Sequence, residues 1–190
     1  MKKITDFFLE LDALKHVQRR SYITGGHRLE NSAEHSWHLA MACWSFADYF
    51  QLEVDMARLL KYALVHDLGE IDAGDTFLYS AERSTANQAE SRCVQRLASH
   101  PGNPIKDLPI LWDEQEFSDS TEATLMKAVD RLLPFLLNIS NEGKTWIESG
   151  VKKSQVIAAH DFIGQVFPDI HQWVTEQIEI AVENNWLLNE

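Results

Sequence analysis

The stretch LVHDLGE, residues 64–70, decides both the fold and the chemistry expected of this chain. It ends an apolar run with one imidazole and two carboxylates, His66, Asp67 and Glu70. On a continuing helix Glu70 would share a face with both earlier residues, because it lies four positions after His66 and three after Asp67. One divalent cation could hold this cluster together. The pattern therefore favours metal-dependent hydrolysis.

The segments on either side of this stretch have the period of amphipathic helices. Their apolar residues recur at spacings of three and four, and no run of strands or internal repeat is visible. Helices are expected at residues 4–17, 32–50, 54–64, 87–100, 110–117, 121–139, 153–167 and 168–188. Asn31 and Glu34 have the spacing of a capping box at the start of the second helix, and Pro134 is a potential kink in the sixth. The sequence therefore predicts an all-α bundle.

Two segments lack this period and are predicted to be loops. Residues 19–30 contain Gly25-Gly26, and residues 70–86 contain Gly74, Asp75 and other small polar residues. Loops held on a rigid scaffold often supply binding and catalytic groups. We therefore expect the second loop to line a pocket.

Length and charge limit the possible partners. A chain of 190 residues that is 45% hydrophobic is expected to form a single domain over residues 1–190. Its 17 basic and 29 acidic residues give a net charge of −12, so most of the surface would repel a nucleic-acid polymer. A small phosphorylated substrate would need a metal ion and a few local arginines to reverse the sign of the charge in a pocket.

The cysteines and the hydropathy pattern predict a cytoplasmic protein. Cys43 and Cys93 form no CxxC pair, which suits a reducing compartment better than a disulfide framework. No targeting segment and no long apolar run is visible, so no membrane partner is expected.

Asp130 is a carboxylate on an apolar helical stripe. By spacing it shares that stripe with Met126, Leu133 and Leu137. A buried ionised carboxylate costs several kcal/mol unless it is paired or bound to a cation. An ion pair with an arginine, or a helix rotated to expose Asp130, explains the pattern equally well. His35 is also ambiguous alone, since a lone histidine near a helix start is usually structural.

These candidate residues together are more informative about function than any one of them alone. His35, the pair His66-Asp67, and Asp130 fall on three separate predicted helices, and this order resembles the HD-domain superfamily of metal-dependent phosphohydrolases. The resemblance extends to NSAEHSW (31–37), to LVHDLGE with Gly74-Asp75, and to KAVDRL (127–132). These motifs look like the small single-domain subgroup that contains the bacterial 5'-deoxynucleotidases. They cover residues 7–140 and leave helices at about 153–188 as packing elements of an HD-domain-like helical bundle.

The resemblance implies that His35, His66, Asp67 and Asp130 bind one divalent metal ion. Two imidazoles and two carboxylates suit Mn²⁺, Co²⁺, Fe²⁺, Ni²⁺, Zn²⁺ or Mg²⁺, and the absence of a thiolate gives no special preference for Zn²⁺. The identity of the ion therefore stays open.

The resemblance also implies roles for Glu70, Asp75 and Arg19. Glu70 and Asp75 would act as general acid and base, in an order that the sequence does not assign. Arg19 would hold the substrate phosphate through paired donors. The competing interpretations are an exposed helix-end carboxylate, a turn residue and a surface ion pair, respectively. Arg20 stands where many relatives have an aromatic residue, which leaves the sugar and base preference open.

The expected activity is removal of the 5'-phosphate from (deoxy)nucleoside monophosphates by metal-activated water, in a protein that the resemblance implies is a homodimer. One alternative keeps the metal but hydrolyses a phosphodiester or a pyrophosphorylated nucleotide. Another is a non-catalytic, metal-stabilised nucleotide sensor. A ferritin-like di-metal site is set aside because no Glu is followed by His three residues later.

Overall fold

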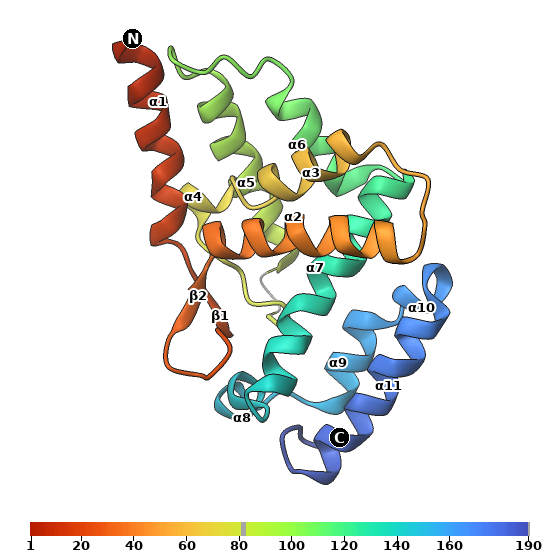
Figure 1. The fold of residues 1–190 in the computed structure, drawn as a ribbon. Coiled ribbons are helices and arrows are strands. Elements are labelled where there is room, and N and C mark those ends of the chain that lie inside the picture. The colour runs from red at the N-terminus through yellow and green to blue at the C-terminus, as the bar shows by residue number, and fades with distance from the viewer. Residues whose placement is uncertain (81–82, 190) are drawn as a thin grey trace.

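The computed structural model describes residues 1–80 and 83–189, which form a mainly helical structure with one two-stranded hairpin (Figure 1). The elements are, in chain order, α1 (Lys2–Asp12), the 3₁₀ helix η1 (Ala13–His16), β1 (Gln18–Tyr22), β2 (Leu29–Asn31), α2 (Ser32–Tyr49), α3 (Met56–Val65), α4 (Glu70–Ala73), α5 (Arg83–Ala98), α6 (Leu108–Phe117), α7 (Thr121–Ser140), α8 (Lys144–Ser149), α9 (Lys153–His160), α10 (Ile163–Val166) and α11 (Pro168–Glu183). None of the helices in these ranges is long and apolar enough to cross a lipid bilayer. The all-α prediction is confirmed.

The start of α2 is fixed by the predicted capping box. Asn31 Oδ1 accepts a hydrogen bond from the Glu34 amide at 3.0 Å, and Glu34 Oε2 accepts one from the Asn31 amide at 3.2 Å. These bonds satisfy two backbone N–H groups that have no partner within the helix. His35 is thereby held in the first turn of α2.

The prediction of a loop at residues 19–30 is wrong, because most of this segment forms an antiparallel hairpin. Gln18 pairs with Asn31 and Tyr22 pairs with Leu29. The reversal passes through Gly25 and Gly26, whose φ angles of +89° and +69° favour glycine. The short strands QRRSY and LEN lack an apolar alternation, so no period in the sequence could reveal them.

Other boundaries differ from the predicted segments. The first predicted helix is divided into α1 and η1, and the segment predicted at 153–167 is divided into α9 and α10. α8 was missed because its six residues, between the left-handed residues Gly143 and Gly150, are too few to show a period. The predicted loop at 70–86 begins with the short helix α4, and its residues 81 and 82 lie outside the described residues.

Within residues 1–80 and 83–189, the core forms two hydrophobic clusters, and α7 supplies residues to both. The larger cluster contains Leu39 of α2, Leu59 of α3 and Leu125 of α7, all fully buried. The smaller cluster contains Phe135 of α7 and Trp146 of α8, with residues from α9 and α11. α7 runs from the upper group of helices to the lower group in Figure 1. Its middle, where Asp130 lies, is therefore packed in the centre of the molecule.

Candidate metal centre and active site

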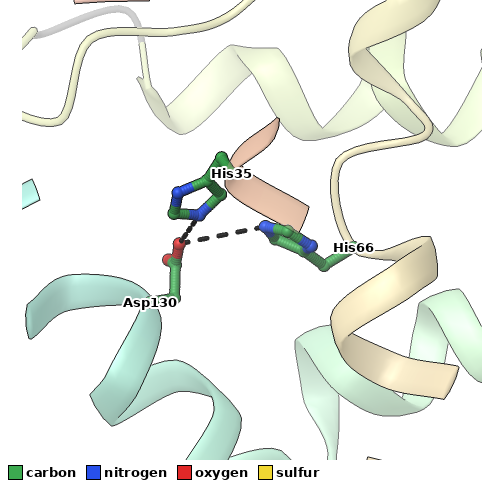
Figure 2. A group of neighbouring side chains, drawn as sticks. All are labelled: His35, His66 and Asp130. Carbon is green, nitrogen blue, oxygen red and sulfur yellow. Dashed lines mark hydrogen bonds and ion pairs between the residues drawn. The ribbon is translucent and has the colours of Figure 1, made fainter. Parts of the chain in front are cut away.

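Three polar side chains from different helices meet at the centre of the fold (Figure 2). His35 comes from the first turn of α2, His66 from the residue after α3, and Asp130 from the middle of α7. Asp130 Oδ1 lies 2.9 Å from His35 Nε2 and 3.9 Å from His66 Nε2. One ligand atom from each residue lies within 4.8 Å of the other two. Three residues far apart in sequence are thus placed as a cation would require.

The residues between His66 and Gly69 form turns, not a continuation of α3. The helix ends at Val65, and the next amide bonds run three residues back, including Glu70 N to Asp67 O at 3.0 Å. The prediction that Glu70 shares a helical face with His66 is therefore wrong in its geometry. The tighter turn nevertheless directs His66, Asp67 and Glu70 toward one cavity.

Gly69 permits this turn to pack closely on α5. A Cβ atom at position 69 would lie 2.5 Å from Glu90 Cβ and 2.8 Å from Glu90 Cα. Real Cβ atoms do not approach so closely, so any side chain here would displace α5 or the turn. The glycine in LVHDLGE is therefore required by packing.

Local hydrogen bonds set the orientation of His66. Its Nδ1 lies 2.9 Å from the carbonyl oxygen of Ala63, which can accept a proton from that nitrogen. The carbonyl oxygen of His66 accepts a hydrogen bond from the indole of buried Trp112 at 3.1 Å. Nε2 is buried and has no hydrogen-bond partner among the described residues, although Asp67 Oδ1 is 3.0 Å away. A nitrogen held in this way is suited to bind a metal ion.

Asp67 lies between His66 and Arg19. Its Oδ2 accepts a hydrogen bond from Arg19 Nη1 at 2.8 Å. Burial raises the pKa of Asp67, but the charges of His66 and Arg19 outweigh burial and lower it to about 2. Burial lowers the pKa of His66, whereas Asp67 raises it, and the net value is about 9. In the metal-free protein, positive charge on His66 and Arg19 therefore balances this buried carboxylate.

Asp130 is similarly held in its ionised form. Burial raises its pKa, but the hydrogen bond with His35 and the charge of Arg131 outweigh burial, so that the pKa lies well below its ordinary value. Arg131 Nη1 donates to Asp130 Oδ2 at 3.1 Å. The sequence analysis left open an ion pair with an arginine, and the neighbouring residue provides one. The carboxylate still keeps Oδ1 directed at the two imidazoles.

The carboxyls of buried Glu70 and half-buried Asp75 lie beside this cluster. Ser32 donates its hydroxyl proton to Glu70 Oε2 at 2.6 Å. Burial and the nearby charge of Asp67 raise the pKa of Glu70 to about 9. Asp75 follows Gly74 after α4, and burial raises its pKa as well. Raised pKa values bring both groups closer to the range in which they can exchange protons near neutral pH.

The predicted site residues meet at one cavity of about 390 Å³. Its walls include Arg19, His66, Asp67, Glu70, Asp75 and Asp130, while His35 lies against Asp130 and contributes no wall. Four basic residues also line it, namely Arg19, Arg20, Lys127 and Arg131. Six acidic residues also line it, Asp67, Glu70, Asp75, Glu90, Glu116 and Asp130. The basic side chains do not outnumber the acidic ones, so a bound divalent cation would add the positive charge that a phosphorylated substrate requires.

The donor set therefore fits a divalent metal ion. Two buried imidazole nitrogens and the half-buried carboxylate of Asp130 face one another, with Asp67 against His66. Nitrogen and oxygen ligands of this kind suit the first-row divalent ions. The sequence assigned no role to three polar residues that lie against the predicted site residues: Ser32 beside Glu70, Arg131 beside Asp130, and Glu30 beside His35. Glu30 was assigned to a loop, and the other two carry no spacing pattern of their own.

Comparison with known proteins places this geometry in a family. A family model described as "HD domain" matches residues 11–171. The chain belongs to the HD domain family. The resemblance singled out His35, the His66-Asp67 pair and Asp130, and all of them lie within this match.

This HD domain protein is similar to several named proteins and to proteins of known structure. The 5'-deoxynucleotidase HDDC2 of Dictyostelium discoideum is 28% identical over 140 residues, which cover 69% of this chain and 73% of that protein. The protein of the same name from Danio rerio is 26% identical over 135 residues, covering 70% of this chain and 66% of the relative. A crystal structure of a predicted metal-dependent phosphohydrolase from Magnetospirillum magnetotacticum MS-1 is 31% identical. It has a TM-score of 0.88 over 98% of this chain and 95% of its own.

Proposed function

We propose that this HD domain protein is a metal-dependent phosphohydrolase that removes the 5'-phosphate from (deoxy)nucleoside monophosphates. The observation that carries the proposal is the convergence of His35, His66 and Asp130 beside the carboxyls of Glu70 and Asp75. The names of the Dictyostelium and zebrafish relatives support the substrate class, and the Magnetospirillum structure supports the reaction type.

In this proposal His35, His66, Asp67 and Asp130 hold one divalent ion. Such an ion, when bound, lowers the pKa of water to about 7 and polarises a phosphoryl oxygen. The contact with Ala63 fixes the ring of His66, and Asp130 is ionised, whereas His66 must lose its Nε2 proton when the ion binds. Mn²⁺, Co²⁺, Fe²⁺, Ni²⁺, Zn²⁺ and Mg²⁺ are the ions to test.

Glu70 and Asp75 are the proposed proton-transfer groups. Both lie in the cavity wall, and the hydrogen bond from Ser32 orients Glu70. One would take a proton from the attacking water while the other gives a proton to the leaving alkoxide. Each such role contributes about 10²–10⁴-fold to the rate.

Arg19 is the proposed phosphate-binding residue. Its Nη1 lies 2.8 Å from Asp67 and 3.9 Å from Asp75. The guanidinium therefore lies beside both a proposed metal ligand and a proposed proton-transfer group. A planar guanidinium can bind a phosphate through two parallel hydrogen bonds. Without this charge the acidic cavity would repel its substrate.

The deciding experiment is a phosphate-release assay with the metal-loaded protein. We expect release of inorganic phosphate from a panel of 5'-nucleoside and 5'-deoxynucleoside monophosphates, and loss of release in His66→Ala. Di- and triphosphates and cyclic dinucleotides in the same panel test the pyrophosphohydrolase and phosphodiesterase alternatives. If no monophosphate is hydrolysed with any of the six ions, the proposal is wrong.

We also propose that the protein is a cytoplasmic homodimer. Cys43 and Cys93 are buried free thiols, as expected in a reducing compartment. Trp37, Met41 and Trp44 of α2 form an exposed apolar stripe, and a subunit interface commonly covers such a surface. Sedimentation equilibrium should give twice the chain mass of 21.8 kDa, and a single-chain mass at micromolar concentration would contradict the dimer.

A further inference from the structure

Three buried polar atoms face one another behind the metal centre. Glu30 Oε2 lies 3.4 Å from His35 Nδ1 and 3.7 Å from Arg19 Nε. None of these three atoms has a hydrogen-bond partner among the described residues. Glu30 is only 3% exposed, and His35 is not exposed at all. A buried carboxylate therefore lies between two N–H donors.

The hairpin creates this arrangement. Arg19 is on β1, Glu30 is on β2, and His35 follows in the first turn of α2. The pairing of Gln18 with Asn31 brings the two strands together next to the capping box. The segment that the sequence analysis took for a loop thus places one carboxylate between two predicted site residues.

The chemistry of a bound metal gives this carboxylate a role. His35 directs Nε2 at Asp130, so Nε2 is the nitrogen available to an ion. An imidazole that binds a metal through Nε2 carries its proton on Nδ1, the atom that faces Glu30. A carboxylate that accepts this proton fixes the ring and increases the basicity of the ligating nitrogen.

The same carboxylate faces Arg19. Arg19 uses Nη1 to contact Asp67, and its Nε is the donor nearest to Glu30. A guanidinium fixed at Nε can present its two terminal nitrogens to a phosphate in a defined direction. Glu30 therefore reaches both the metal ligand and the phosphate-binding residue.

We propose that Glu30 is a positioning residue that orients His35 through Nδ1 and Arg19 through Nε, and so couples the metal site to the phosphate site. The inference deepens the proposed function and rests on its metal site. Closure of the two contacts by a few tenths of an ångström would give ordinary hydrogen bonds. Glu30 touches neither the ion nor the reacting atoms, and it acts through its two neighbours.

The test compares Glu30→Gln with the matched variant Glu34→Gln. Glu34 lies four residues away in the same junction, is exposed, and pairs with Arg28. Glutamine at position 34 can still complete the capping box. Binding of Mn²⁺ to each metal-free protein is measured by calorimetry without nucleotide, beside urea unfolding and the kcat and KM for a nucleoside monophosphate.

We expect Glu30→Gln to weaken Mn²⁺ binding by about 10–100-fold, the range typical of lost outer-shell partners, and to raise KM. Glu34→Gln should match wild type in both. If Mn²⁺ affinity in Glu30→Gln stays within about twofold of wild type, the inference is overturned, even if the variant unfolds at lower urea. Should Glu30→Gln not fold, Glu30→Asp decides: retained charge at shorter reach should give weaker Mn²⁺ binding, and wild-type binding would overturn the inference.

Failure of the inference is distinguishable from failure of the proposed function. Wild-type protein that binds Mn²⁺ and hydrolyses nucleotides, with unchanged binding in Glu30→Gln, removes only the role of Glu30. Wild-type protein that binds no divalent ion removes the metal site and, with it, both proposals.

Discussion

The Nδ1 atom of His66 lies 2.9 Å from the carbonyl oxygen of Ala63, one turn back in α3. This contact fixes the proton on Nδ1 and leaves Nε2 facing Asp130. Because the backbone of α3 sets the position of the carbonyl, the helix itself determines which nitrogen the cavity receives.

His66→Ala should abolish metal binding at the Mn²⁺ concentrations that saturate the wild-type protein. The loss should exceed the roughly 10–100-fold that removal of an outer-shell partner causes, because a ligand itself is removed. His38→Ala is the matched control, since His38 is on α2 outside the cavity wall. Calorimetry with Mn²⁺ measures both. Equal affinities in the two variants would show that His66 holds no ion.

Glu70→Gln and Asp75→Asn should each lower kcat by about 10²–10⁴-fold with Mn²⁺ affinity nearly unchanged, because these residues are proposed to move protons. Asp72→Asn is the control, since Asp72 lies between them in sequence and pairs with Arg96 outside the cavity wall. Steady-state kinetics and calorimetry separate the two effects. Unchanged turnover and ligand affinity in both site variants would favour the non-catalytic sensor.

The metal-free protein should lose stability as the pH rises from 6 to 9. The folded pKa of His66 is raised from 6.5 to about 9, because Asp67 outweighs burial, so its stabilising contribution is full below pH 6.5 and is lost as pH rises through 9. Burial raises the pKa of Glu70 from 4.5 to about 9, so ionisation penalises the folded state increasingly between these values. Both effects have the same sign, since the folded state binds more protons than the unfolded chain.

Urea unfolding of the metal-free protein at pH 6, 7.5 and 9 measures this loss. In Glu70→Gln the dependence should be shallower, because one of the two groups is gone. With saturating Mn²⁺ the trend should weaken or reverse, since metal binding requires deprotonated histidine. A metal-free protein whose urea midpoint rises with pH would contradict the prediction.

Gly69→Ala should lower the free energy of unfolding by about 1–3 kcal/mol, the range for overpacking in a close-packed interior. The added Cβ would meet the backbone of Glu90, which a rotamer change cannot move away. Metal affinity should fall as well, because the same turn carries His66 and Asp67. A urea midpoint equal to wild type would mean that the turn and α5 are not in close contact in solution.

The elements of the fold that depend on interactions between neighbouring residues in the sequence were predicted well. The helical period predicted the main helices, and the spacing of Asn31 and Glu34 predicted the start of α2 because a capping box involves only neighbouring residues. The hairpin was not predicted because its strands, QRRSY and LEN, have no alternation of apolar and polar residues. α8 was not predicted because its six residues are too few to show a period, and no pattern in the sequence marks the break between α9 and α10.

The residues of the candidate site also differ in whether a local pattern or only tertiary packing reveals them. The spacing in LVHDLGE pointed to one cavity-lining cluster, although the backbone there is a series of turns and not a helix. That His35 and Asp130 join this cluster came from the resemblance, since only tertiary packing brings α2 and α7 to it. Glu30 and Ser32 were missed because an isolated buried glutamate or serine has no sequence pattern. Their functional roles remain predictions.

Asp130 lies on the part of α7 that packs in the larger hydrophobic cluster, which extends to Leu133, and Phe135 of the smaller cluster follows on the same helix. An ion bound there would favour only those conformations in which both clusters are assembled on the same helix. By mass action its binding free energy would then also stabilise the C-terminal helices, although these supply none of the proposed ligands. Metal binding and the packing of these helices would then depend on each other. A substitution in α9 or α11 that disturbs this packing would weaken metal binding, and with it activity, although every ligand is still in place.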